Sequence, residues 1–165
     1  MSKTHTMADP ANPESETTRS DPNAGKRTQA RELAMKLVYV LDVRGAEGVA
    51  GDINRIIGRE GPMREVEAFA RELYQGVLES LSEIDEKVKE AAANWDIERM
   101  ALIDRALLRI AVFELLFRFD IPPRVTIDEA LELSKRYSTE KSASFINGVL
   151  DKIFRTYAAD KDNMI

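Results

Sequence analysis

The strongest constraint on the fold is a long stretch of chain that is nearly free of helix-breaking residues. No glycine lies between Gly76 and Gly148, and the only prolines of this stretch are Pro122 and Pro123. Glycine and proline disfavour a helix interior more than any other residues. Apolar residues recur at spacings of three and four along the stretch, and no Asn-Gly turn joins two alternating apolar runs. The sequence therefore predicts an all-α protein.

The apolar periodicity also divides the chain into helices, which we expect to form a bundle of two packed halves, about 26–95 and about 96–159. The central helix, 99–119, is apolar on almost every side, which is typical of a helix packed on several faces. Pro122 and Pro123 end it. Before the central helix, further helices are expected at 27–43, at 52–59 and at 66–95, the last with a bend near Ser82. After it, one helix is expected to begin at a capping box of Thr126 and Glu129, and a last helix at a cap formed by Ser138 or Thr139.

Both ends of the chain are predicted to lack stable structure. Residues 1–25 contain three of the six prolines, and methionine is their only large apolar side chain. Such a segment cannot bury enough apolar surface to offset the entropy of ordering it. We therefore expect a disordered tail at 1–25 and a frayed terminus at 160–165.

Composition excludes several classes of function. The formal net charge is -5, so any nucleic-acid site must be a local patch and not a general polycationic surface. The chain has no cysteine and a single histidine, His5, and it lacks the motifs of phosphate, dinucleotide, acyl and zinc chemistry. We expect a protein that is not an enzyme and that binds neither a metal nor a cofactor. The absence of a secretory signal and of any run of 18 apolar residues predicts a cytoplasmic protein without a membrane span.

The first predicted helix is the one basic segment. Residues 26–44 contain five basic and two acidic residues, whereas the rest of the chain is acidic. On a helical wheel Arg27, Arg31, Met35 and Tyr39 form an i, i+4 ridge that turns away from the apolar face towards solvent. Arginine binds phosphates or stacks on bases, and a tyrosine ring can stack on an unpaired base. The ridge is a candidate RNA site, and the alternative is an ordinary solvated face of an amphipathic helix.

The last predicted helix has two unusual positions. Phe145 lies at the edge of the apolar stripe and not at its centre, so we expect it to be either partly exposed or peripheral core. Gly148 lies nearly opposite that stripe, where glycine costs about 1 kcal/mol relative to alanine. This cost suggests that another backbone or a partner approaches closely there.

Three sequence blocks of the chain have the length and specificity of family motifs. The opening block reads KRTQARELAMKLVYVLD, and the central block reads ALLRIAVFELLFRFDIPPRVTIDEALELSKRY. The closing block reads FINGVLDKI. Together the blocks extend from Lys26 to Phe154, and the central and closing blocks are long and specific. The three blocks resemble those of the NusB family of bacterial transcription antitermination factors, and from its sequence the chain is identified as a member of this family.

The resemblance implies a fold, a function and partners. The fold would be a NusB-like helical bundle of two subdomains. The family pairs with the small-subunit ribosomal protein NusE and binds boxA-type single-stranded RNA in nascent ribosomal RNA transcripts. The pair helps RNA polymerase read through terminators, so the expected role is a non-catalytic RNA adaptor whose contact with the polymerase complex is indirect. The alternative is a helical interaction module, for example a homodimer that covers the basic ridge.

The resemblance also assigns roles to particular residues of the three blocks. Arg109, in the central block, is either a further RNA contact or a structural tie to a carboxylate or a helix end. The RNA contacts that the resemblance implies are Lys26, Arg27, Arg31, Tyr39, Arg105 and Phe145.

Two positions depart from the family pattern. Thr28 and Gln29 interrupt a run that often contains three or more arginines, which predicts weaker RNA binding by the chain alone. Lys141 stands before the closing block, where an acidic residue is common, and this leaves the details of the NusE interface open. A partner is thus expected to be necessary for tight RNA binding.

Overall fold

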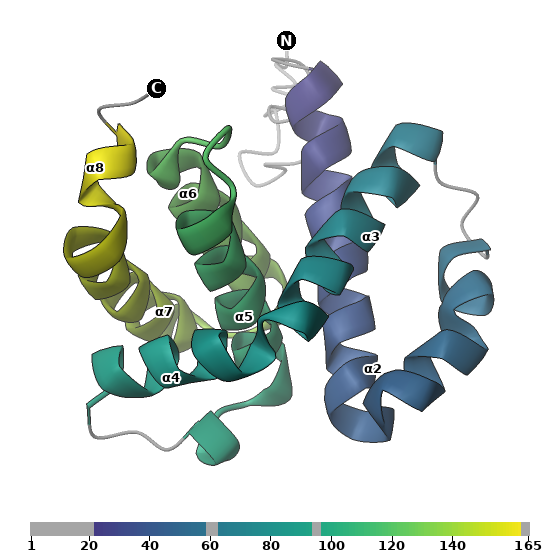
Figure 1. Cartoon of the computed structure of the whole chain (residues 1–165), viewed down its shortest axis with the longest axis horizontal. Helices are drawn as coiled ribbons and strands as arrows, with labels where there is room; N and C mark the ends of the chain where they lie inside the picture. The colour runs from purple at the N-terminus through teal and green to yellow at the C-terminus, as the bar shows by residue number, and fades with distance from the viewer. Residues whose placement is uncertain (1–21, 59–62, 94–96, 163–165) are drawn as a thin grey trace, which may run out of the picture.

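The computed structural model describes residues 22–58, 63–93 and 97–162, and every regular element within these ranges is a helix. The prediction of an all-α fold is confirmed. None of the described helices is both long and apolar enough to cross a membrane. The elements, shown in Figure 1, are α2 (Pro22–Gly58), α3 (Arg64–Glu79), α4 (Leu81–Ala91), a 3-10 turn (Ile97–Arg99), α5 (Leu102–Phe117), α6 (Pro123–Tyr137), α7 (Glu140–Ile153), a π-helical turn (Phe154–Ala158) and α8 (Ala159–Asp162).

The first long helix consists of two helical segments joined at a glycine. Gly45 lies inside α2 with φ 76°, a left-handed conformation that glycine adopts without steric cost. The chain turns there, so the second segment runs away from the first (Figure 1). This agrees with the two separate helices expected from the sequence. The first segment begins at Pro22, inside the expected tail, whereas residues 1–21, with His5, lie outside the described residues.

The remaining helices are arranged around α5. The predicted bend near Ser82 occurs at Ser80, where α3 ends and α4 begins in a new direction (Figure 1). α3 packs against α2 and α5, whereas α4 packs against α5 and α7. α5, α6 and α7 all contact one another. α4 therefore belongs by packing to the C-terminal helices, and the division into halves near residue 95 stays a prediction.

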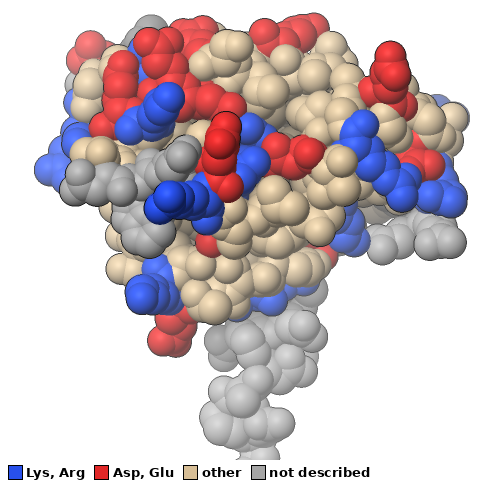
Figure 2. Space-filling model, turned by 90° about the horizontal axis from the view of Figure 1, so that it is seen from below, with Lys and Arg blue, Asp and Glu red and all other residues tan. Residues whose placement is uncertain are grey.

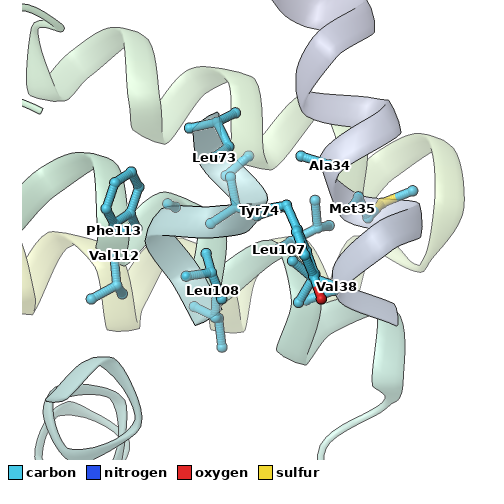
Figure 3. Close-up of a cluster of buried hydrophobic side chains, with 14 of the residues drawn as sticks. Ala34, Met35, Val38, Leu73, Tyr74, Leu107, Leu108, Val112 and Phe113 are labelled. Atoms are coloured by element: carbon cyan, nitrogen blue, oxygen red, sulfur yellow. The ribbon is translucent and has the colours of Figure 1, made fainter. Parts of the chain in front are cut away.

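The main core lies where α2, α3 and α5 meet. Nearly every residue of α5 from Ala106 to Leu115 is buried, which confirms a helix packed on several sides. A Cβ atom at Gly76 of α3 would lie 2.1 Å from Cζ of Phe113, so only glycine permits this approach. Burial of a leucine side chain contributes about 1.5–3 kcal/mol. Figure 3 shows the side chains that converge here: Ala34, Met35, Val38, Leu73, Tyr74, Leu107, Leu108, Val112 and Phe113.

The last long helix follows its predicted cap. The hydroxyl of Thr139 accepts a hydrogen bond from the main-chain nitrogen of Ser142 at 3.0 Å, which fixes the start of α7. Phe145 is half-buried and packs against the core. Gly148 is exposed, and no described residue beyond its own helix turn would lie within 4 Å of a Cβ there. The suggested close approach at Gly148 therefore does not occur among the described residues.

Candidate functional site

The basic start of α2 presents two cations at the surface. Lys26 Nζ lies 2.7 Å from Glu65 Oε2 of α3, in an ion pair that is open to solvent. Exposed pairs of this kind contribute about 0–1 kcal/mol, so an external anion can replace the carboxylate at little cost. The guanidinium carbon of Arg27, an exposed residue, lies 4.1 Å from the centre of the Phe69 ring on α3. Both cations are therefore accessible to an anionic ligand.

Arg31 does not belong to an exposed ridge, so that prediction is wrong. Arg31 is 3% exposed, and its Nε and one terminal nitrogen donate to the two carboxylate oxygens of Glu114 on α5 at 2.8 and 2.9 Å. Met35 is 1% exposed and lies in the core (Figure 3). The helical wheel failed because α2 packs against both α3 and α5, so its buried surface is wider than one apolar stripe.

Glu114 is the centre of a buried network that ties α2, α5, α6 and α8 together. Its Oε1 also accepts a hydrogen bond from Thr126 Oγ1 at 2.8 Å. Its main-chain oxygen accepts one from Lys161 Nζ at 2.8 Å. Burial lowers the pKa of Lys161 below its ordinary value, and the nearby carboxylates offset only part of this effect. The expected fraying of 160–165 is therefore wrong at Lys161, which is helical and 3% exposed; residues 163–165 lie outside the described residues.

Thr126 and Glu129 do not form the predicted capping box. α6 begins three residues before Thr126, at Pro123, whose missing N–H is not needed in a first turn. The Thr126 hydroxyl is engaged by Glu114, and the Thr28 hydroxyl of α2 lies 2.9 and 3.0 Å from the two carboxylate oxygens of Glu129. Burial raises the pKa of Glu129 above its ordinary value, although the hydrogen bond from Thr28 lowers it. Tertiary contacts with α2 and α5 have thus replaced local capping.

Arg105 lies where the start of α5 meets the middle of α2. One terminal nitrogen lies 3.4 Å from Asp42 Oδ1, and the other donates to the main-chain oxygen of Glu98 at 3.0 Å. Asp42 follows Tyr39 on α2 by three residues, and Tyr39 is 37% exposed. The structure therefore places Arg105 beside the segment of α2 that presents the predicted tyrosine.

The start of α5 also contacts α7, the helix of Phe145. Ser142 Oγ of α7 donates to Asp104 Oδ2 of α5 at 2.8 Å. This hydrogen bond joins the start of α5 to the helix that carries Phe145.

Arg109 is a structural tie, which decides between its two sequence-based interpretations. It is 6% exposed, and it donates to both carboxylate oxygens of Asp85 on α4 at 2.9 Å and to Asp42 Oδ1 at 2.8 Å. Burial lowers the pKa of Arg109, but the hydrogen bonds and charges of the two aspartates outweigh this and raise it. Arg109 therefore joins α2, α4 and α5.

The predicted site residues form two groups on the surface. Lys26 and Arg27 lie beside α3 and border a hollow of about 440 Å³. Tyr39 follows Arg27 by twelve residues, or about 18 Å of helix, and Arg105 contacts Asp42, three residues after Tyr39. On the face seen in Figure 2, basic and acidic side chains are interspersed with uncharged surface, so positive charge on this face is local. Separate cations and aromatic rings of this kind can contact phosphates and stack on bases.

Comparison with known proteins identifies the family. A sequence model of the NusB family matches residues 28–155. The chain belongs to the NusB family. The matched range includes Tyr39, Arg105 and Phe145, whereas Lys26 and Arg27 lie just before it.

Full-length relatives support the same assignment. The transcription antitermination protein NusB of Anaeromyxobacter dehalogenans (strain 2CP-1 / ATCC BAA-258) is 45% identical over 129 residues, which are 78% of this chain and 89% of that protein. The protein of the same name from Pseudothermotoga lettingae is 38% identical over 142 residues, which are 85% of this chain and 99% of that protein.

Solved structures share the fold. T. maritima NusB is 35% identical and superimposes with a TM-score of 0.76, over 84% of this chain and 97% of that one. A structure described as antitermination factors NusB and NusE in complex with double-stranded RNA gives 26% identity and a TM-score of 0.73, over 81% of this chain and 98% of that one. The expected NusB-like helical fold is confirmed.

Two aromatic residues near the site were not identified from the sequence. Phe69 lies within the predicted helix at 66–95, and nothing in its own segment indicates that arginines from other helices surround it. Tyr137 is 38% exposed, and its hydroxyl donates to Glu32 of α2. Arg136, which lies 3.5 Å from the same carboxylate, is the one sequence signal that could have marked this turn as surface.

Proposed function

We propose that this member of the NusB family is a non-catalytic RNA adaptor in transcription antitermination. It would bind boxA-type single-stranded RNA together with ribosomal protein NusE and act on RNA polymerase through the assembled complex. The observation that carries the proposal is the superposition on a NusB chain solved with NusE and RNA, over 81% of this chain. The cations at the start of α2 and the exposed Tyr39 farther along it support the same function.

We propose that the two groups of side chains contact different parts of the RNA. Lys26 and Arg27 bind phosphates, since both are accessible cations. Tyr39 stacks on an unpaired base, and Arg105 and Phe145 contact the RNA at the junction of α2, α5 and α7. Arg31 is not an RNA contact in this proposal, because it is buried and donates to Glu114. Arg31 instead stabilises the packing of α2 against α5.

Fluorescence anisotropy tests this function directly. The labelled ligands are a short boxA-type RNA, a scrambled RNA of equal length and a duplex of the boxA sequence, each with and without NusE from the same organism. We expect selective binding of the single-stranded boxA RNA that tightens when NusE is added. Equal, weak binding of all three RNAs, unaffected by NusE, would refute the proposal. A loss of affinity as protein concentration rises would indicate a homodimer that covers the site.

A matched pair of arginine variants tests the assigned surface. Phosphate contacts by Lys26, Arg27 and Arg105 predict a log-log salt slope of about -2 for single-stranded RNA, or about 0.7 for each contact. Arg27→Ala should reduce the steepness of that slope by about 0.7. Arg155→Ala is the control, since Arg155 is 72% exposed near the end of α7 and far along the chain from the basic segment. Equal slopes for both variants would contradict the placement of RNA at Arg27.

A further inference from the structure

Three arginines surround one aromatic ring beside the basic start of α2. The guanidinium carbons of Arg27, Arg118 and Arg31 lie 4.1, 5.3 and 5.6 Å from the centre of the Phe69 ring. Phe69 is only 7% exposed and belongs to the hydrophobic core. The ring is therefore a fixed surface, against which long and otherwise flexible side chains lie.

The three arginines differ in their ionic partners. Arg31 is held by Glu114, and Arg118 donates to both carboxylate oxygens of Asp120 at 2.9 and 3.0 Å and to Glu72 at 3.2 Å. Arg27 is exposed and has no carboxylate within salt-bridge distance among the described residues, although its charge adds to the effect of Arg118 in lowering the pKa of Asp120. Of the three, Arg27 can therefore bind an external anion without breaking an ion pair.

The ring contact prepares Arg27 for such an anion. The face of an aromatic ring attracts a guanidinium through its quadrupole, and a guanidinium placed over a ring keeps its in-plane N–H donors for a phosphate. Holding the side chain before the ligand arrives reduces the conformational entropy that is lost on binding. The adjacent hollow of about 440 Å³ provides space for the ligand; it is lined by Lys26, Arg27, Glu65, Ala68, Phe69 and Glu72.

The acidic residues of this hollow are already paired. Glu65 lies 2.7 Å from Lys26 Nζ, and Glu72 lies 3.2 Å from a terminal nitrogen of Arg118. We propose that Phe69 is a positioning residue, which acts through Arg27 by holding its guanidinium where it contacts an RNA phosphate. This inference rests on the proposed RNA-binding function and adds a buried residue of α3 to that site.

A double-mutant cycle in RNA affinity tests the proposal. Phe69→Leu keeps the position apolar but removes the ring face, and it should weaken binding of the boxA RNA about two- to fivefold, the range of a partly exposed cation–π contact. The Arg27→Ala/Phe69→Leu double variant should bind no more weakly than Arg27→Ala. Phe69→Tyr keeps the ring and should bind RNA like the unmodified chain.

Phe113→Leu is the matched control, because Phe113 is 9% exposed on α5 and no arginine of the described residues lies over its ring. It should lower thermal stability as Phe69→Leu does, while leaving RNA affinity unchanged. A side-chain NMR signal of Arg27 should lose its ring-current shift in Phe69→Leu and keep it in Phe113→Leu. This readout does not depend on RNA.

The outcomes separate this inference from the proposed function. If the unmodified chain does not discriminate boxA RNA from scrambled RNA, the proposed function fails. If it does, but the losses from Phe69→Leu and Arg27→Ala simply multiply in the double variant, Phe69 is only structural and this inference alone is overturned. Equal losses of affinity in Phe113→Leu and Phe69→Leu would overturn it as well.

Discussion

Replacement of Arg31 by methionine is expected to destabilise the fold by about 3–5 kcal/mol, because it leaves Glu114 as an unpaired buried charge. On an exposed ridge the same change would cost less than about 0.5 kcal/mol. Arg31 and Glu114 are 3% and 1% exposed, so water cannot reach the carboxylate that remains. The experiment therefore decides whether Arg31 is an internal support or a surface cation.

The magnitude follows from the geometry of the pair. Two hydrogen bonds of 2.8 and 2.9 Å join the guanidinium to the carboxylate. At a charge separation near 4 Å and an effective dielectric constant near 20, the attraction is about 4 kcal/mol. Methionine retains most of the apolar stem of Arg31, so a large cavity contributes little to the loss. The hydroxyl of Thr126, at 2.8 Å, is the remaining partner of the carboxylate and cannot neutralise it.

Chemical unfolding followed by helical circular dichroism provides the measurement. We expect losses of about 3–5 kcal/mol for Arg31→Met and for Glu114→Met, and a loss for the double variant well below their sum, since neither charge is then left alone. The double variant should still lose about 1–3 kcal/mol, because the Thr126 hydroxyl has no acceptor. Arg155→Met is the exposed control.

Two results would refute this reasoning. A loss below about 1 kcal/mol for Arg31→Met with an unchanged denaturant slope would mean that the charge of Glu114 is not buried. Unchanged stability together with lost RNA binding would mean that Arg31 reaches the RNA after all. Affinity should therefore be measured at a temperature where each variant is folded.

Three further predictions concern two glycines and the partly buried carboxylate of Glu129 on α6. Gly76→Ala should cost about 1–3 kcal/mol, measured by thermal unfolding, because its Cβ would overlap the Phe113 ring. Gly148→Ala, in an open helix interior, should instead stabilise by about 0.5–1 kcal/mol in the same assay, and a loss would indicate a contact that the geometry lacks. Burial raises the pKa of Glu129 above 4.5, so its contribution to stability is present below pH 4.5 and is lost as pH rises through the folded-state pKa. The stability of Glu129→Gln relative to the unmodified chain should rise over that pH interval, and a constant difference would contradict the shift.

Local sequence determined where the helices lie and where most of them end. Residues that start or stop a helix act within one turn, so Thr139 could be recognised as a cap and the glycine-rich segment after Val43 as a break. The apolar density of 99–119 likewise predicted that α5 would be central, since such a helix is stable only when several neighbours cover it. The family-specific blocks identified the NusB-like fold, because each block contains the helix ends and the apolar positions of one part of that fold.

The candidate site could be predicted only in part. Lys26, Arg27 and Tyr39 are accessible as expected, since each lies where α2 has little cover. Arg31 lies on the same helix but is buried, because the packing of α5 on α2 places Glu114 beside it. Glu114 is 83 residues away in the sequence. A helical wheel describes one helix and has no information about which faces other helices cover.

Only the tertiary structure determined which partners the buried polar side chains bind. Thr126 and Glu129 have the spacing of a local cap, but Glu129 lies beside Thr28, 101 residues away, and Lys161 binds the main chain of Glu114, 47 residues away. Removal from water makes an unpaired polar group far more costly than a lost cap, so long-range partners prevail wherever packing buries the group. The sequence by itself determined the helices and their family, through interactions within a turn; which charges face solvent and which are buried was determined only when those helices packed.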